Sequence, residues 1–84
     1  MNTINILPVF VALNTTANKV VFQVLTLDLS PTEFKLNARF FQDTNEITNI
    51  PFELPLSVYE LWTDDKYLED VCLSHFKLER ANNG

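Results

Sequence analysis

The chain has 84 residues and a formal net charge of −5, and 46% of its residues are hydrophobic, including seven Phe, two Tyr and one Trp. This length suffices for one domain, residues 1–84, and the aromatic content excludes an intrinsically disordered chain. The six basic residues are scattered along the sequence, which argues against nucleic-acid partners and against binding to an anionic membrane.

The first apolar stretch, residues 4–13, is rich in β-branched and aromatic residues and predicts a strand. Pro8 cannot donate a ladder hydrogen bond, so this strand is expected at a sheet edge or with a bulge. The stretch is too short to cross a bilayer and has no basic flank before it, so we expect neither a membrane anchor nor a cleaved signal peptide. The single cysteine, Cys72, rules out an internal disulfide and fits a reducing compartment.

A polar loop is expected over residues 14–18, and a second strand over residues 19–29. Residues 32–41 give the clearest strand pattern, because Phe34, Leu36, Ala38 and Phe40 alternate with polar side chains. A turn at 42–45 and a weaker fourth strand over 47–54 follow, and Pro51 places that strand at an edge. The short connections favour an antiparallel meander.

The last third of the chain changes to a helical period. Ser57 and Glu60 have the spacing of a capping box and predict a first helix start. Thr63 is expected to cap a second helix with Asp64 and Asp65 in its first turn, and Trp62 and Tyr67 are expected to pin that start to the sheet. The apolar face of this second helix is predicted to carry four residues: Leu68, Val71, Cys72 and His75.

The predicted fold is therefore α+β, with an antiparallel sheet of about four strands, as a meander or a small sandwich, followed by one or two short helices. Residues 1–55 form the β-rich part. Residues 56–79 form the helical part, with its last helix ending near Ser74. Residues 80–84 are expected to fray.

No catalytic or metal-binding residue is predicted. Cys72 and His75 are within reach of each other on a helix, but the chain has no glycine-rich turn to supply an oxyanion site, so we expect both to line the core. An acidic cluster lacks the alternating oxygens and central glycine of a calcium loop; it comprises Asp64, Asp65, Glu69 and Asp70. The chain is thus expected to be no enzyme and to need no cofactor.

The second strand is apolar on both faces, and so is the first. Strands of this kind must be covered on both faces. Either the sheet folds over itself into a small sandwich or open barrel, or a partner chain covers the second face. For the second alternative, the predicted protein-contact residues are Val21, Leu25, Leu27, Phe41 and Phe52.

The segment from Tyr59 to Val71 resembles an ending found in small structural (virion) proteins of tailed bacteriophages. That ending runs roughly Tyr-x-x-Trp-Gly-x-Asp-Asp-x-Tyr, followed by a helix and Leu-Gly-Leu. This chain lacks the glycine after Trp62 and has one residue fewer before its acidic pair, and Phe76-Lys77-Leu78 stands where the final Leu-x-Leu would be.

The resemblance implies a non-enzymatic structural or assembly protein, located in the virion or in the cytoplasm of the infected bacterium. Its partners would be copies of itself and other virion proteins, bound through apolar strand faces or edges. The negative charge leaves a second class of function open, a small acidic adaptor or inhibitor that binds one host protein.

Overall fold

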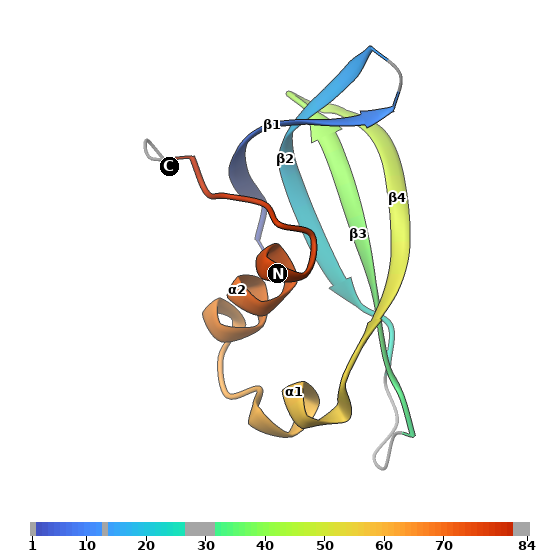
Figure 1. Ribbon diagram of the computed structural model, residues 1–84, viewed down its shortest axis with the longest axis vertical. Coiled ribbons are helices and arrows are strands. Elements are labelled where there is room, and N and C mark those ends of the chain that lie inside the picture. Colours follow the sequence, from blue (N-terminus) through green and yellow to red (C-terminus); the bar gives the residue numbers. More distant parts are fainter. Residues whose placement is uncertain (1, 13, 27–31, 82–84) are drawn as a thin grey trace.

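The computed structural model describes residues 2–12, 14–26 and 32–81 (Figure 1). In chain order its elements are β1 (Ile4–Ala12), β2 (Thr15–Val24), β3 (Phe34–Gln42), β4 (Asn45–Leu54), α1 (Leu56–Leu61) and α2 (Asp65–His75). The four strands lie side by side in chain order, and each is antiparallel to the next. The predicted α+β fold with an antiparallel meander is confirmed.

The strand β3 supplies the centre of the core, as its alternating pattern predicts. Phe34, Leu36 and Ala38 are fully buried, while Lys35 between them is exposed. Both helices lie on one side of the sheet (Figure 1). The core therefore forms between this face of the sheet and α2, whose Leu68 is fully buried against it.

Both hairpins turn more tightly than predicted. The expected loop over residues 14–18 is wrong, because β2 already begins at Thr15. Asn14 has a φ of 58°, a left-handed conformation that Asn adopts more readily than most residues, so the chain reverses at once. Asp43 has a φ of 55° in the second turn, and β4 begins two residues earlier than expected, at Asn45.

Asp43 in the second turn is tied to Asn18, a residue of β2, by a pair of hydrogen bonds. Asn18 Nδ2 donates a hydrogen bond to Asp43 Oδ1 at 3.0 Å, and the Asp43 amide donates one to Asn18 Oδ1 at 2.9 Å. At its other end β2 stops at Val24, earlier than the predicted strand; residues 27–29 of that prediction lie outside the described residues.

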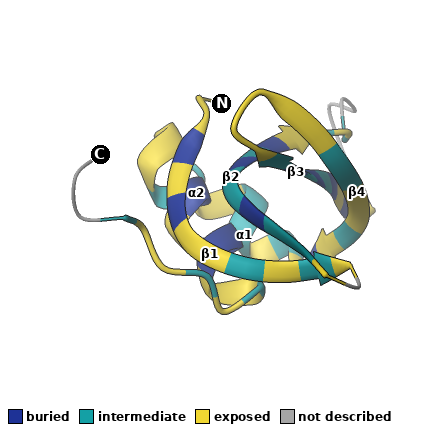
Figure 2. Ribbon diagram, turned by 90° about the horizontal axis from the view of Figure 1, so that it is seen from above, coloured by how far each residue is buried: buried dark blue, intermediate teal, exposed yellow. Residues whose placement is uncertain are grey.

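The β1–β2 hairpin changes its buried face along its length. Figure 2 shows buried residues in the first half of β1 and only intermediate and exposed ones in its second half. Before Pro8 the even-numbered residues Ile4 and Ile6 are buried. After Pro8 the odd-numbered residues of β1 pack against the core, and Phe10 is 78% exposed. The pairing register with β2 shifts across Pro8, and β1 is an edge strand, so both expectations for this proline are confirmed.

The strand β2 shows the same change of face. Ala17 is fully buried near the hairpin turn, and Val20 and Phe22 are fully buried farther along, on the opposite side of the strand by simple alternation. A hairpin that bends over in this way buries one face in its first half and the other face in its second. This change of face accounts for part of the apolar character of β1 without a partner chain, while Leu7 and Phe10 stay exposed.

Both predicted helix N-caps are wrong, by two residues for the first helix and by one residue for the second. The helix α1 begins at Leu56 with Pro55 as its N-cap, and no side chain caps it, so Ser57 lies inside the helix. Asp64, not Thr63, caps α2: its side chain accepts a hydrogen bond from the Tyr67 amide at 2.8 Å. Asp and Thr are both good N-caps, and the chain path from α1 determines which of two adjacent residues takes the role.

Trp62 connects the helices to the sheet as predicted, and its partner in the sheet is the ring of Phe34. Its indole stacks on Phe34 in β3 with ring centroids 6.1 Å apart, and it also contacts Tyr59 edge-on. With Thr63 as N-cap, Trp62 and Tyr67 would have held the two positions of a hydrophobic staple. Because Asp64 is the N-cap, they do not hold those positions.

The buried stripe of α2 is rotated from the predicted one. Leu68 and Cys72 lie in the core as expected, but Leu73 is buried as well, while His75 is exposed. His75 stacks on Phe52 of β4 at 5.0 Å. The prediction that His75 lines the core is therefore wrong, because the sheet contacts α2 along residues 68, 72 and 73.

The helix α2 ends one residue later than predicted, at His75, in a Schellman motif. The Leu78 amide donates to the Leu73 carbonyl at 2.8 Å, and the Lys77 amide donates to the Ser74 carbonyl at 3.1 Å. Lys77 adopts a φ of 57°, a conformation that glycine adopts without a steric cost.

Replacing Lys77 with Gly is expected to raise the free energy of unfolding by about 0.5–1 kcal/mol, because it relieves the left-handed strain. The same change at Lys66, which is exposed inside α2, should lower it by up to about 1 kcal/mol. Urea denaturation of both variants measures the two effects. A loss of stability in the Lys77→Gly variant would contradict the described helix end.

The expected fraying of residues 80–84 is wrong for the part that the structure describes. The Leu7 amide donates to the Glu79 carbonyl and the Ala81 amide to the Asn5 carbonyl, both at 2.9 Å, and Arg80 forms an antiparallel bridge with Ile6. These backbone hydrogen bonds hold the tail against the outer edge of β1. Residues 82–84 lie outside the described residues.

Candidate protein-interaction surface

The predicted contact residues that the structure describes do not all lie on one face of the sheet. Val21 is half-buried and lies directly opposite Arg39 in the β2–β3 register. Phe41 is half-buried beneath the Arg39 guanidinium, whose central carbon is 5.3 Å from the ring centroid. Leu27 lies outside the described residues.

Arg39 also binds Glu46 across the β3–β4 pair, with Nε 2.6 Å from Oε1. The hydrogen bond to Arg39 lowers the pKa of Glu46 below its ordinary value, and the same bond raises the pKa of Arg39. This ion pair lies beside Phe41 on the face of the sheet opposite the helices. Phe41 is thus already partnered within the chain.

Phe52 belongs to an aromatic cluster on the helix side of the sheet. Its ring meets Phe76 edge-on at 4.8 Å and Phe22 edge-on at 6.1 Å, and it stacks on His75 at 5.0 Å. Its half-buried side chain therefore lies at the edge of the hydrophobic core. A partner chain would contact only the exposed part of this side chain.

Among the four predicted contact residues that the structure describes, Leu25 is the most exposed. It is 51% exposed, just past the end of β2, and its amide donates to the Lys35 carbonyl at 2.9 Å. A shallow hollow of about 250 Å³ adjoins it. The hollow is lined by Leu25, Lys35, Leu36, Pro51, Phe52 and Glu53. Leu25 is thus held in place by the backbone while its side chain stays open to a partner.

Four other large apolar residues are substantially exposed in the described parts of the chain: Leu7, Phe10, Ile50 and Leu61. Phe10 reaches 78% exposure and Leu61 reaches 62%. Phe10 was expected within the first strand, at an edge or with a bulge, and was not among the predicted contact residues. Pro8 was the sequence feature that could have indicated the exposure of Phe10, because a bulge there changes which side chains of the strand meet solvent.

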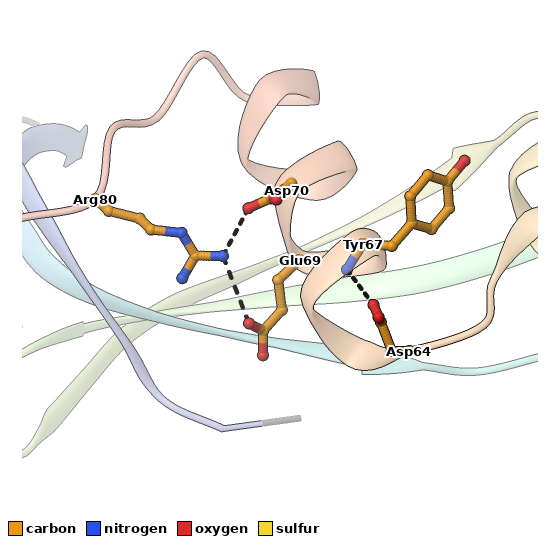
Figure 3. A network of polar contacts seen from close by, with 5 residues as sticks. All are labelled: Asp64, Tyr67, Glu69, Asp70 and Arg80. Carbon is orange, nitrogen blue, oxygen red and sulfur yellow. Dashed lines mark hydrogen bonds and ion pairs between the residues drawn. The ribbon is translucent and has the colours of Figure 1, made fainter.

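The acidic cluster is divided among separate roles (Figure 3). Asp64 caps α2, Asp65 lies in its first turn, and Arg80 binds the other two carboxylates, at 2.7 Å from Asp70 and 3.6 Å from Glu69. Glu69 is 9% exposed, so Arg80 compensates a largely buried charge. No group of three or more His, Cys, Asp or Glu side chains suited to a metal ion occurs within residues 2–12, 14–26 and 32–81.

Cys72 and His75 are not arranged as nucleophile and base. Cys72 is fully buried, and this burial, followed by the negative charge of Glu69, raises the pKa of its thiol to about 12. His75 lies exposed against Phe52. At neutral pH the Cys72 sulfur is a protonated core atom rather than a thiolate.

The helices of the described chain are α1, with six residues, and α2, with eleven. Neither is long and apolar enough to cross a membrane. In comparisons with protein-family models, with curated proteins and with solved structures, no family, sequence or structure matches the chain.

Proposed function

We propose that this protein is a non-enzymatic structural or assembly protein that binds other protein subunits through exposed apolar positions of its sheet. The observation that carries the proposal is Leu25, which is 51% exposed although a backbone hydrogen bond fixes its position. Because the backbone of Leu25 is already fixed, a partner that covers this residue has to order only its side chain. It is therefore the kind of residue that anchors a protein–protein contact.

The state of Cys72 supports a function without catalysis. A reactive cysteine requires a stabilised thiolate, a neighbouring base and access to substrate. Burial raises the pKa of this thiol instead, and the exposed ring of His75 is stacked on Phe52. The cysteine, histidine and carboxylate side chains of α2 thus serve packing and charge balance.

We further propose that the assembly is a phage particle. The support is the resemblance of residues 59–71 to the endings of small virion proteins, together with a physical role for that segment. Trp62 anchors the start of α2 to Phe34, and Asp64 caps the helix. The motif therefore acts as architecture that holds the helices to the sheet, which suits a structural protein.

Particles harvested from cells that make this chain should contain it, and replacing Leu25 with Ser is expected to reduce its incorporation at least 10-fold. The change should alter the free energy of unfolding by less than about 0.5 kcal/mol, because Leu25 is exposed. Quantitative blotting of density-gradient fractions measures incorporation, and urea denaturation measures stability.

The matched control is Leu61→Ser in α1, which removes an even more exposed leucine, at 62%, away from the hollow. It should leave incorporation unchanged. Unfolding of the isolated Leu25→Ser chain would show that Leu25 is a core residue, and particles that lack the wild-type chain would refute the virion location.

The distribution of charge favours one second candidate, an acidic adaptor that binds a basic protein. Residues 56–79 contain six acidic and two basic residues, a net charge of −4, which is most of the net charge of the whole chain. Binding of this kind weakens steeply with salt, whereas a contact through Leu25 should be nearly insensitive to it. The salt dependence of binding therefore distinguishes the two functions.

A further inference from the structure

The two edges of the sheet are protected to different extents. The strand β4 carries Glu46, Glu53 and Pro51, the charges and proline that natural proteins use to prevent an edge from pairing with another chain. The first half of β1 is covered by the tail, through the bridge between Ile6 and Arg80 and its flanking hydrogen bonds.

The second half of β1, residues 9–12, has none of these protections. It contains no proline and no charged residue, and within the described chain its backbone pairs with β2 alone. Phe10 at its middle is 78% exposed. An unprotected edge with an exposed aromatic side chain is a template for strand addition.

The charge pattern indicates which chain would pair there. The first 18 residues contain no Asp, Glu, Lys or Arg, so all of the net charge of −5 lies in the rest of the sequence. In a two-fold symmetric contact each residue near the axis meets its own copy, and any charge there repels itself. Such a contact centred on the middle of β4 would place Glu46 of each copy near Glu53 of the other, and these like charges repel, whereas β1 brings together only uncharged residues.

We propose that the edge of β1 at residues 9–12 pairs with the same edge of a second copy, antiparallel across a two-fold axis near Phe10. The backbone groups of the two strands satisfy each other, and the two Phe10 rings lie side by side as a cross-strand pair, which removes them from water. The two meanders then form one continuous sheet. This inference deepens the proposed function by naming one partner, a second copy of the chain.

Light scattering of the purified chain over a concentration series tests the pairing. The wild type should approach twice the single-chain mass of 9.7 kDa. The Phe10→Lys and Phe10→Glu variants should each associate about 100-fold more weakly, because like charges then face each other. Mixing the two variants at low salt should restore the dimer, since opposite charges now meet at the axis. This rescue is specific to a contact in which Phe10 meets Phe10.

The Leu61→Lys variant is the matched control, because it introduces the same charge at an exposed apolar site on α1, and it should remain dimeric. Circular dichroism should show that all variants keep the fold. A wild-type chain that is monomeric at every concentration would overturn the pairing. It would also be overturned if Phe10→Lys left the mass unchanged or if the mixed variants failed to associate.

The mass in solution and the incorporation into particles together distinguish the β1 contact from the proposed assembly role. A dimer of the purified chain that never enters a particle would refute the assembly role while leaving the β1 contact intact. Incorporation of a chain that stays monomeric in solution, with Phe10→Lys incorporated as efficiently as the wild type, would refute the β1 contact while leaving the assembly role intact.

Discussion

Replacing Phe22 with Ala is expected to lower the free energy of unfolding by about 3–5 kcal/mol. Phe22 is fully buried in β2, and its ring contacts Phe52 at 6.1 Å and Phe76 at 6.3 Å. It thus joins the second strand, the fourth strand and the end of α2. A domain of this size has only about 5–15 kcal/mol of net stability, so the variant should be close to unfolding at room temperature.

Urea denaturation followed by circular dichroism measures this effect. The matched control is Phe10→Ala, the same substitution in the neighbouring strand at a site that is 78% exposed. At concentrations where the chain is monomeric it should change the free energy of unfolding by less than about 0.5 kcal/mol. Equal effects of the two substitutions would contradict the described core.

The thiol of Cys72 should be almost inert toward alkylating reagents in the folded chain. Burial raises its pKa from an ordinary value of 9.0 to about 12, and the charge of Glu69 adds to the shift. Near pH 8 the thiolate population is then about 1,000-fold smaller than in the unfolded chain, before steric protection is counted. Mass spectrometry of iodoacetamide adducts with and without urea measures the ratio, and rapid alkylation of the folded chain would refute the burial.

The same shift makes stability depend on pH in a defined direction. Below pH 9.0 the thiol is protonated in both states, and its contribution to stability is fully present. Between pH 9.0 and about 12 the unfolded chain loses this proton first, so stability falls as pH rises, by at most about 1.4 kcal/mol per pH unit. A Cys72→Ala variant should lack this part of the decline, and the difference between the two chains isolates it from other titrating groups.

The candidate surface was only partly predictable. Leu25 falls on the second face of an apolar strand, and the structure leaves it 51% exposed, so its role as a contact residue stays a prediction. Phe52 shares that apolar character, but the structure turns its ring toward Phe76 and α2. Apolar composition indicates that a side chain needs cover, and only the fold shows whether the chain itself provides it.

Features that depend on neighbouring residues were determined by the sequence itself. The alternation around Phe34 defines β3 and its buried face, and Pro8 and Pro51 assign the two edges, because a proline cannot donate a ladder hydrogen bond. The short connections then allow only an antiparallel order. These rules act over a few residues, so they hold before any tertiary contact forms.

The tertiary structure decided what depends on residues far apart in the chain. Whether Thr63 or Asp64 caps α2 follows from the path between the helices, and the sheet determines that α2 buries Leu73 and leaves His75 exposed. Arg80 is ordered because β1 offers an open edge and Glu69 a largely buried charge. Interactions between neighbouring residues favour none of these alternatives over the others. The whole fold selects among them, because it buries apolar surface and pairs polar groups that lie far apart in the chain.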